Sequence, residues 1–396
     1  MKKMLFTGIL SLGLAATSLI STNFAQTPKN IKEWTYLIYI NADNNLDKFG
    51  VGDLEEMAEI GSNENVNIVV QLDRAYGKPA KRYFVQKGDT NMVEDLGEVD
   101  MGSVKTLTEF VEWGSTNYPA EHYATVIWNH GSGWNKRATN GVFKGISYDD
   151  QSGNHITTAQ LTGAAKDIRN ILGKKLDIMA FDACLMQMLE VSYAMKDDVE
   201  IMLASQETEP GEGWAYNDSL KELVNKKGLT AQEVSTIIVD TYDASYDSGS
   251  QGNSSTTQSW VDLSKTDALV DALNVLAEQL MDGHKTQLKS AVASVQKFYY
   301  RSNVDLIHLL ELLSPNLSGE ASDACKKAII AANAFVGHHA THGSKMKNSK
   351  GTAIYFPANG YSFSDKYLKL EFAKVSKWDE MLKSFYKASK TRMQDL

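Results

Sequence analysis

The sequence of 396 residues contains only two cysteines, Cys184 and Cys325, and it has fewer basic than acidic side chains. Two cysteines allow one disulfide at most, so a small scaffold held together by several bridges is excluded. Lysine and arginine number 40 against 49 aspartates and glutamates, which gives a formal net charge of −9. This balance argues against a nucleic-acid-binding protein, because such proteins normally present a basic surface.

Long hydrophobic runs are also absent after the first 25 residues. No later run approaches the roughly 20 apolar residues that span a bilayer, so we predict no membrane span. At the N-terminus, Lys2 and Lys3 precede an apolar segment at 4–20, and the small residue Ala25 precedes a polar stretch. This pattern predicts a secretory signal peptide over residues 1–25. Its removal would change the net charge from −9 to −9 − 2 = −11, and we expect the protein to be secreted.

The fractions of hydrophobic residues (43%) and charged residues (22%) are those of a packed globular protein. After the signal peptide, short apolar runs alternate with amphipathic segments. The apolar runs predict strands at 35–42, 66–73, 123–129, 176–181 and 200–206. The amphipathic segments between them predict helices at 46–61, 105–114 and 158–172. Continuous apolar runs separated by helices are typical of parallel strands that are covered on both faces. The expected architecture is an α/β sandwich.

The pattern changes towards helix after about residue 215. One helical stripe is formed by Leu269, Leu273, Leu276 and Leu280. Residues 247–259 form a low-complexity segment and predict a loop, whereas the apolar run 351–357 predicts a strand that returns to the sheet. We therefore divide the chain into the signal peptide (1–25), an α/β core (26–215) and a helical C-terminal region (216–396).

Two of the predicted strands end at residues that can perform chemistry. His130 follows the strand at 123–129, and Cys184 follows the strand at 176–181. Because parallel sheets bind ligands at the carboxyl ends of their strands, neighbouring strands would bring these side chains together. A thiol beside an imidazole is the minimum for nucleophilic acyl transfer, and backbone N–H groups in the glycine-rich turn after His130 could stabilise an oxyanion. Taken singly, each residue is more often a packed or hydrogen-bonded side chain than a catalytic one.

The sequence around the two residues resembles the clostripain family of cysteine peptidases, in the caspase-like clan. The similarity extends from about residue 35 to about residue 360. It is carried by WNHGSGW (128–134) and FDACLM (181–186), with support from NADNNLD (41–47), ETEPGEGWAY (207–216), NVDL (303–306) and GTAIYFP (351–357). The separation of 184 − 130 = 54 residues is similar to the ~50 residues found in caspases, although the caspase Gln and Gly around the cysteine are absent. The resemblance implies a caspase-like α/β/α sandwich with a mostly parallel central sheet and a helical C-terminal elaboration.

The resemblance also implies roles for individual positions. Cys184 would be the nucleophile, His130 the general acid and base, and the N–H groups of Gly131 and Cys184 the oxyanion hole. Asp182 matches the acidic residue that, in the family, lines a pocket for lysine or arginine, and a buried carboxylate there would reject neutral side chains. Alternatively, Asp182 caps a helix that begins after Cys184. No third residue is evident beside His130, so we predict a catalytic dyad.

The segment between the two catalytic stretches, residues 135–150, is polar and carries Lys136, Arg137 and Lys144. Such loops are cut easily, and tethering near an active site gives them a high effective concentration there. The resemblance implies activation by internal cleavage in this region. We favour cleavage between Lys144 and Gly145, with Arg137 as the second choice because it is closer to the catalytic turn. The alternative is that these are ordinary solvated loop charges.

The remaining histidines, methionines and cysteines that could bind a metal or react are interpreted as structural residues. The segment 337–343 contains His338, His339 and His342, but it lacks a nearby acid or cysteine and is predicted to be a loop, so we expect no zinc site. Core positions are predicted for Cys325 and for the methionines Met179, Met186, Met188 and Met195. Cys184, at the end of a buried strand, is more typical of packing or a nucleophile than of a disulfide.

Residues 43–47 have side-chain oxygens at the positions expected in a calcium loop, namely Asp43, Asn45 and Asp47. An EF-hand is excluded, because Lys48 and Leu54 stand where that loop needs Gly and Glu. The predicted chemistry requires no cofactor and no metal. The family resemblance nevertheless leaves room for a structural or activating calcium ion.

These observations predict a secreted cysteine endopeptidase that cleaves proteins or peptides after Arg or Lys, activates itself by internal cleavage and binds no nucleic acid. One alternative is a catalytically silent binding protein on the same scaffold. The other is a cysteine hydrolase of non-peptide amides. Both strands and both motifs are retained, which argues against the silent scaffold.

Overall fold

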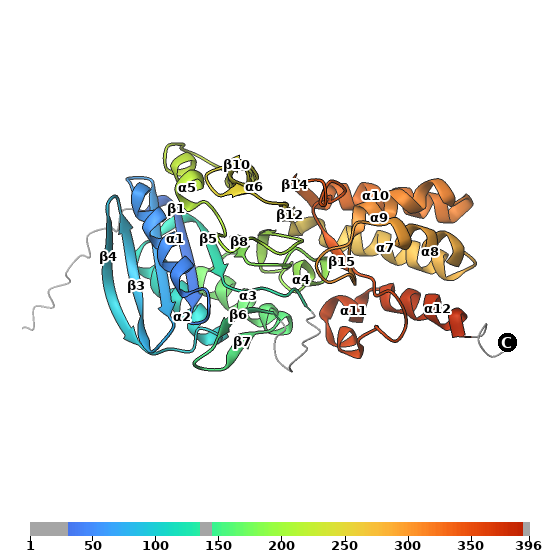
Figure 1. The fold of residues 1–396 in the computed structure, drawn as a ribbon, viewed down its shortest axis with the longest axis horizontal. Helices are drawn as coiled ribbons and strands as arrows, with labels where there is room; N and C mark the ends of the chain where they lie inside the picture. The colour runs from blue at the N-terminus through green and yellow to red at the C-terminus, as the bar shows by residue number, and fades with distance from the viewer. Residues whose placement is uncertain (1–30, 135–144, 391–396) are drawn as a thin grey trace, which may run out of the picture. The chain divides into compact units, whose positions relative to one another are not determined.

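The computed structural model describes residues 31–134 and 145–390, so the predicted signal peptide lies outside the described residues. Its main feature is a nine-stranded sheet in the order β14-β12-β9-β8-β5-β1-β2-β3-β4 (Figure 1). The strands are β1 (Lys32–Ala42), β2 (Val66–Arg74), β3 (Lys78–Gln86), β4 (Asp89–Gly97), β5 (Ala120–Trp128), β8 (Leu176–Asp182), β9 (Val199–Ala204), β12 (Thr256–Asp262) and β14 (Val336–His342).

The centre of this sheet is parallel and its margins are antiparallel. Strands β2, β1, β5, β8 and β9 pair in parallel, whereas β3 and β4 on one side and β12 and β14 on the other pair antiparallel. All five predicted strands of the α/β core belong to the parallel centre. The prediction of an α/β fold with a parallel core is therefore confirmed.

The two faces of the sheet have separate hydrophobic cores, because alternate side chains of each strand point to opposite faces. On β1, Leu37 and Tyr39 enter one core, whereas Tyr36, Ile38 and Ile40 enter the other. Both sets are buried, which explains why the strand is a continuous apolar run. Residues of α2 (Val104–Asn117) and α3 (Thr158–Leu172) line the first core, and residues of α1 (Asp47–Ile60), α5 (Tyr216–Val224) and α6 (Ala231–Tyr246) line the second.

The C-terminal region is mainly helical. The short helix α4 (Leu189–Tyr193) still belongs to the α/β core. The C-terminal region contains α5 and α6, followed by α7 (Thr266–Met281), α8 (Lys285–Ser294), α9 (Leu306–Leu313), α10 (Gly319–Phe335), α11 (Glu371–Val375) and α12 (Trp378–Lys390). Helix α7 packs against α10 and α12, and the four leucines of its predicted stripe are buried. The four methionines and Cys325 are buried too, as predicted. Among the described residues, no helix is long and apolar enough to cross a membrane.

Three two-stranded sheets complete the structure. They pair β6 (Ile146–Asp149) with β7 (Asn154–Ile156), β10 (Asp247–Gly249) with β11 (Gly252–Asn253), and β13 (Asn303–Asp305) with β15 (Ala353–Tyr355). The segment 351–357 was predicted to return to the main sheet, but β15 pairs with β13 instead. The region after residue 215 does supply two strands of the main sheet, β12 and β14. Strand β12 begins within the predicted loop 247–259, and β14 contains the histidine-rich segment predicted to be a loop.

Candidate active site

The carboxyl ends of β5 and β8 bring His130 and Cys184 to the same edge of the sheet. These two strands pair in parallel with Trp128 opposite Asp182, so His130 and Cys184 each stand two residues beyond the last paired position. The Asn129 N–H continues the ladder by donating to the Asp182 carbonyl oxygen at 3.3 Å. The structure therefore brings the two predicted residues to the same edge of the sheet, at the ends of adjacent strands, for the reason expected of a parallel sheet.

Gly131 lies directly against the backbone of Cys184. A Cβ atom at position 131 would be 2.3 Å from the Cys184 carbonyl oxygen, so only glycine fits there. Gly131 also forms an isolated antiparallel bridge with Ile146. The N–H of Ser132 donates to the Gly145 carbonyl oxygen in this bridge, which leaves the Gly131 N–H outside it. This turn therefore packs directly against the backbone of Cys184.

His130 is hydrogen-bonded to a residue that the sequence analysis did not connect with catalysis. Its Nε2 atom lies 2.8 Å from the Oδ1 atom of Asn45, in the turn between β1 and α1. The neighbouring Asn44 fixes that turn, because its Nδ2 group donates to the Tyr148 carbonyl oxygen at 2.9 Å. Asn45 therefore adds a third residue to the predicted pair. Its only sequence signal was its position in the segment NADNNLD, which resembles the family.

The thiol of Cys184 is largely enclosed. Its Sγ atom accepts a hydrogen bond from the Glu209 N–H at 3.3 Å. Burial raises the pKa of the Cys184 thiol to about 12, and Glu209 contributes in the same direction. The thiol is therefore protonated at neutral pH and needs a base before it can attack. Both cysteines are free, so the chain uses neither in a disulfide.

The residue after the nucleophile is strained. Leu185 has a φ of 67°, in the left-handed region that residues with side chains rarely adopt. Its N–H donates to the Glu207 carbonyl oxygen at 3.0 Å, and its side chain is buried. This conformation turns the chain sharply after Cys184 and costs on the order of 1 kcal/mol, which the surrounding contacts offset.

Asp182 is buried beneath this edge of the sheet and is not a helix cap, since α4 begins only at Leu189. Its Oδ2 atom accepts hydrogen bonds from the Tyr216 hydroxyl at 2.9 Å and from the Trp214 N–H at 3.4 Å. Burial raises the pKa of Asp182 to about 6, and a hydrogen bond from Glu209 opposes this rise. The pKa of Glu209 is raised well above its ordinary value, by burial and then by Asp182. With its pKa near 6, Asp182 is negatively charged at neutral pH, and this charge disfavours ionisation of Glu209.

The predicted cleavage point is only half described. Lys144 lies outside the described residues, as do Lys136 and Arg137, whereas Gly145 is buried. The Gly145 N–H donates to the Ser132 hydroxyl at 3.0 Å, and its φ of 128° requires glycine. Two hydrogen bonds thus join Gly145 directly to Ser132 in the catalytic turn.

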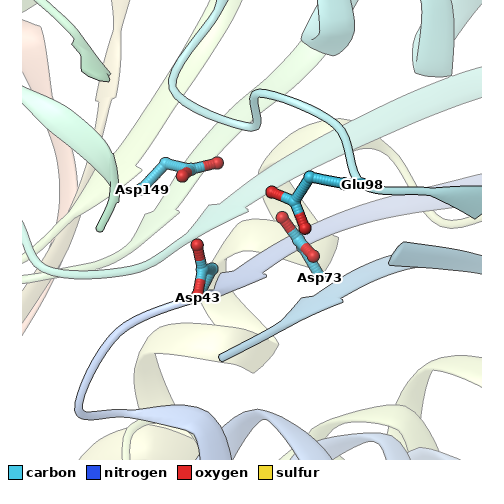
Figure 2. A group of neighbouring side chains, drawn as sticks. All are labelled: Asp43, Asp73, Glu98 and Asp149. Atoms are coloured by element: carbon cyan, nitrogen blue, oxygen red, sulfur yellow. The ribbon is translucent and has the colours of Figure 1, made fainter. Parts of the chain in front are cut away.

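The histidine-rich strand β14 has no metal-binding geometry in the described part of the chain. His338 contacts Asp240 at 2.7 Å, whereas His342 contacts Asp247 at 3.6 Å, so the two rings point to different partners. The expectation of no zinc site at these histidines stays a prediction about the protein in solution. A different group, Asp43, Asp73, Glu98 and Asp149, brings one carboxylate oxygen from each residue within 4.8 Å of the others (Figure 2).

A cavity of about 490 Å³ lies at the opposite edge of the sheet, at the amino ends of the parallel strands. It is lined by Glu33, Trp34, Glu121, His122, Asp177, Glu200 and residues 228–232. Several of its polar groups already have partners: Asp177 contacts His122 and Lys174, and Glu33 accepts from the Gly228 N–H. This cavity is not part of the candidate active site.

Comparison with known proteins gives matches over most of the described residues. The clostripain family model matches residues 38–385. The chain is 25% identical over 229 residues to clostripain of Hathewaya histolytica, and the match covers 50% of this chain and 43% of that protein. The match therefore spans less than half of this curated relative.

Solved structures show the same fold. A secreted C11 cysteine protease from Bacteroides thetaiotaomicron in complex with an irreversible peptide inhibitor has a TM-score of 0.70 and 21% identity, covering 88% of this chain and 99% of that one. An inactive zymogen C11 protease from Parabacteroides distasonis has a TM-score of 0.65 and 19% identity, covering 87% of this chain and 99% of that one. At these identities the similarity concerns the fold.

Proposed function

Because the chain belongs to the clostripain family of cysteine peptidases, we propose that it is a secreted cysteine endopeptidase that cleaves after Arg and Lys. The observation that carries this proposal is the placement of Cys184 and His130 two residues beyond paired positions of adjacent parallel strands. Secretion rests on the N-terminal pattern of residues 1–25, which lie outside the described residues.

The catalytic steps follow from the two side chains. Since the His130 Nε2 atom faces the Asn45 oxygen, Nε2 carries a proton and Nδ1 is the nitrogen that accepts the thiol proton of Cys184. The sulfur then attacks the peptide carbonyl carbon, and the carbonyl oxygen takes the electron pair and the negative charge. The N–H groups of Gly131 and Cys184 stabilise that charge.

Collapse of this intermediate breaks the peptide bond. The imidazolium of His130 gives its proton to the leaving amine, and a thioester remains on Cys184. Water then attacks the thioester, His130 accepts the water's proton, and the acid product leaves as the thiol is restored. This sequence needs no cofactor. We place any calcium ion outside the chemistry.

Specificity for basic side chains is assigned to Asp182 with Glu209. A buried carboxylate that keeps a negative charge attracts a lysine or arginine, and neutral side chains cannot compensate for its burial. Gly213 leaves room at this position, because a Cβ atom there would lie 3.1 Å from an Asp182 carboxylate oxygen. The family resemblance supports the same assignment.

Peptide substrates that release a fluorophore test the function against its alternatives. A panel with Arg, Lys, Asp or Leu before the scissile bond is expected to show cleavage of the Arg and Lys members only, because only they pair with Asp182. A non-peptide amide of the same fluorophore serves as the control. No cleavage of any peptide would favour the silent binding protein, and cleavage of the amide alone would favour the non-peptide hydrolase.

We further propose that the enzyme activates itself by cutting between Lys144 and Gly145. The buried Gly145 is hydrogen-bonded to Ser132, two residues after His130, so the following segment is held beside the active site. The Parabacteroides neighbour is described as an inactive zymogen. On a denaturing gel, purified wild type should give two chains, one with Gly145 at its N-terminus, because Lys144 matches the basic specificity.

Three variants control this experiment. Cys184→Ala should remain one chain, because it lacks the nucleophile, and Lys144→Gln should remain uncut at this bond. Arg137→Gln changes the same charge on the same segment and should be processed normally. A single full-length band from fully active wild type would rule out self-activation by cleavage.

A further inference from the structure

Two adjacent tyrosines lie in the segment that joins α8 to β13, which comes close to the candidate active site. The side chain of Tyr299 is 65% exposed, whereas Tyr300 is half-buried and packs against the first hydrophobic core. The centres of the two rings are 5.1 Å apart, and the rings meet edge to face at 73°. Tyr299 therefore presents an aromatic surface to solvent, and Tyr300 supports it from the side of the protein.

The backbone holds this segment in a fixed turn. The N–H of Phe298 donates to the Asn303 carbonyl oxygen at 3.1 Å, and the N–H of Asn303 donates to the Tyr300 carbonyl oxygen at 2.7 Å. Asn303 then begins β13, which pairs with β15. A group that the fold already holds in place loses little conformational freedom on binding a ligand. Tyr299 is therefore placed on a preorganised support.

The tyrosine segment packs against the turn that follows His130. The Nδ2 group of Asn303 donates to the Sδ atom of Met188 at 3.4 Å. A Cβ atom at Gly133 would lie 2.7 Å from the same sulfur atom, so Met188 lies between the two segments and contacts both. Gly133 is three residues after His130. The tyrosines therefore belong to the surroundings of the catalytic turn.

The same segment is also connected to the nucleophile. Burial raises the pKa of Tyr300 to about 12, and Tyr299 and Cys184 contribute in the same direction. The carbonyl oxygen of Glu207 accepts the N–H of Leu185, the residue after Cys184, at 3.0 Å. Burial raises the pKa of the Glu207 carboxyl, and its hydrogen bonds, which include one from the Tyr299 N–H, oppose this rise. Glu207 thus joins Tyr299 to the nucleophile's own turn.

The tyrosines and the Asp182 pocket lie on opposite faces of the sheet. Trp214 and Tyr216, which donate hydrogen bonds to Asp182, belong to the second hydrophobic core. Phe298 belongs to the first core, and Tyr300 packs against it. In an extended peptide, successive side chains point to opposite sides. A substrate whose basic side chain enters the Asp182 pocket therefore directs its next side chain toward the face of the tyrosines.

We propose that Tyr299, supported by Tyr300, binds the side chain of the substrate residue that follows the scissile bond and selects an aromatic or large apolar side chain there. The nitrogen of that residue is the leaving amine, which His130 protonates, so this residue must lie beside the turn of His130. Aromatic rings bind other rings and apolar groups favourably, beyond the effect of the buried area alone. This inference rests on the proposed function.

Internally quenched peptides test the subsite. They share one sequence up to an Arg and carry Phe or Gly directly after it. Wild type should cleave the Arg–Phe peptide with a kcat/KM about tenfold above that of the Arg–Gly peptide, and in Tyr299→Ala this ratio should fall to within about twofold. Cleavage of the Arg–Gly peptide should be the same in both proteins, because glycine has no side chain to bind. Tyr299→Phe keeps the ring and should keep the wild-type ratio.

A change of charge at the same position gives a second readout, which a merely structural role would not produce. Tyr299→Glu should raise the ratio of Arg–Lys to Arg–Glu cleavage by up to about fivefold, the effect of one exposed charge pair. Tyr76→Ala removes another exposed tyrosine, from the turn between β2 and β3, three strands away from β8. It should behave like wild type with every peptide, and circular dichroism checks the fold of each variant.

A further peptide pair carries Phe or Gly before the Arg and Gly after it. Tyr299→Ala should leave the ratio for this pair unchanged. If the substitution changes this ratio and not the first one, Tyr299 binds the acyl side of the substrate and the inference is overturned. Equal cleavage of Arg–Phe and Arg–Gly by wild type would also overturn the subsite and leave the proposed function intact. Wild type that cleaves neither peptide would refute the proposed function, and the subsite with it.

Discussion

Cys184→Ala is expected to abolish peptide cleavage, with a fall in kcat of at least about 10⁴-fold. The substitution removes the only atom that can form the thioester and leaves a smaller side chain in a partly enclosed position. The fold should be retained, because alanine fits wherever the cysteine does. Turnover of an Arg peptide by purified protein, with circular dichroism as a check of the fold, measures the effect.

His130→Ala should cause a loss of similar size, because the protonated thiol of Cys184 then has no base. Two control variants test whether the loss is specific to Cys184 and His130 or follows from removing any cysteine or histidine. Cys325→Ala changes the other free thiol, which is buried in α10, and His122→Ala changes a histidine at the amino end of the same strand β5. Both should retain activity. Wild-type rates in purified Cys184→Ala would show that a different residue is the nucleophile.

Asp182→Asn is expected to remove the preference for basic residues. The amide keeps the shape of the side chain and loses the charge, so cleavage after Arg and Lys should fall while any cleavage after Leu stays the same. Losing one desolvated charge pair costs about 2–5 kcal/mol, which corresponds to a loss of roughly 30- to 4,000-fold in kcat/KM. The peptide panel with Arg, Lys and Leu measures this ratio.

Glu200→Gln is the control for that variant, since it removes one exposed negative charge at the opposite end of the neighbouring strand β9. Its ratio of Arg to Leu cleavage should equal that of wild type. An unchanged ratio in Asp182→Asn would move the specificity-determining acid to another residue, with Glu209 the first to test.

The same carboxylate predicts a pH dependence with a definite sign. Burial raises the pKa of Asp182 from 3.8 to about 6, so its negative charge is lost as the pH falls through about 6. Cleavage after Arg should therefore weaken below about pH 6, whereas an ordinary aspartate would keep its charge to about pH 4. The ratio of Arg to Leu cleavage isolates this effect, because any pH dependence of Cys184 and His130 is common to both peptides. The ratio should fall below about pH 6 in wild type and should stay constant with pH in Asp182→Asn.

The amino-acid sequence alone was sufficient to predict the parallel centre of the sheet and to identify the two candidate catalytic residues. Each central strand is buried on both faces, so its apolar run is visible in a short local window. Helix α3 was predicted with its observed bounds, because a capping box at Thr157 and a glycine after Leu172 mark its two ends. His130 and Cys184 were found because each directly follows such a run.

The outer strands were missed because they lack this local signal. Residues of β4 are mostly exposed or half-exposed, and β14 carries its histidines at the edge of the sheet. Neither strand is apolar enough to differ from a loop in sequence. The segment of β15 was apolar and was predicted as a strand, but its partner is β13, and pairing depends on contacts that no local pattern specifies.

Only the tertiary structure decided which distant residues surround the catalytic pair. Asn45 is 130 − 45 = 85 residues from the histidine it contacts, and Glu209 reaches Asp182 from the loop after β9. Asp43, Asp73, Glu98 and Asp149 lie close together although they come from four separate parts of the chain. Hydrogen bonds and charge interactions act over a few ångströms in space. Sequence periodicity reports burial along one element at a time, so it could place each of these residues at a strand end but not beside its partner.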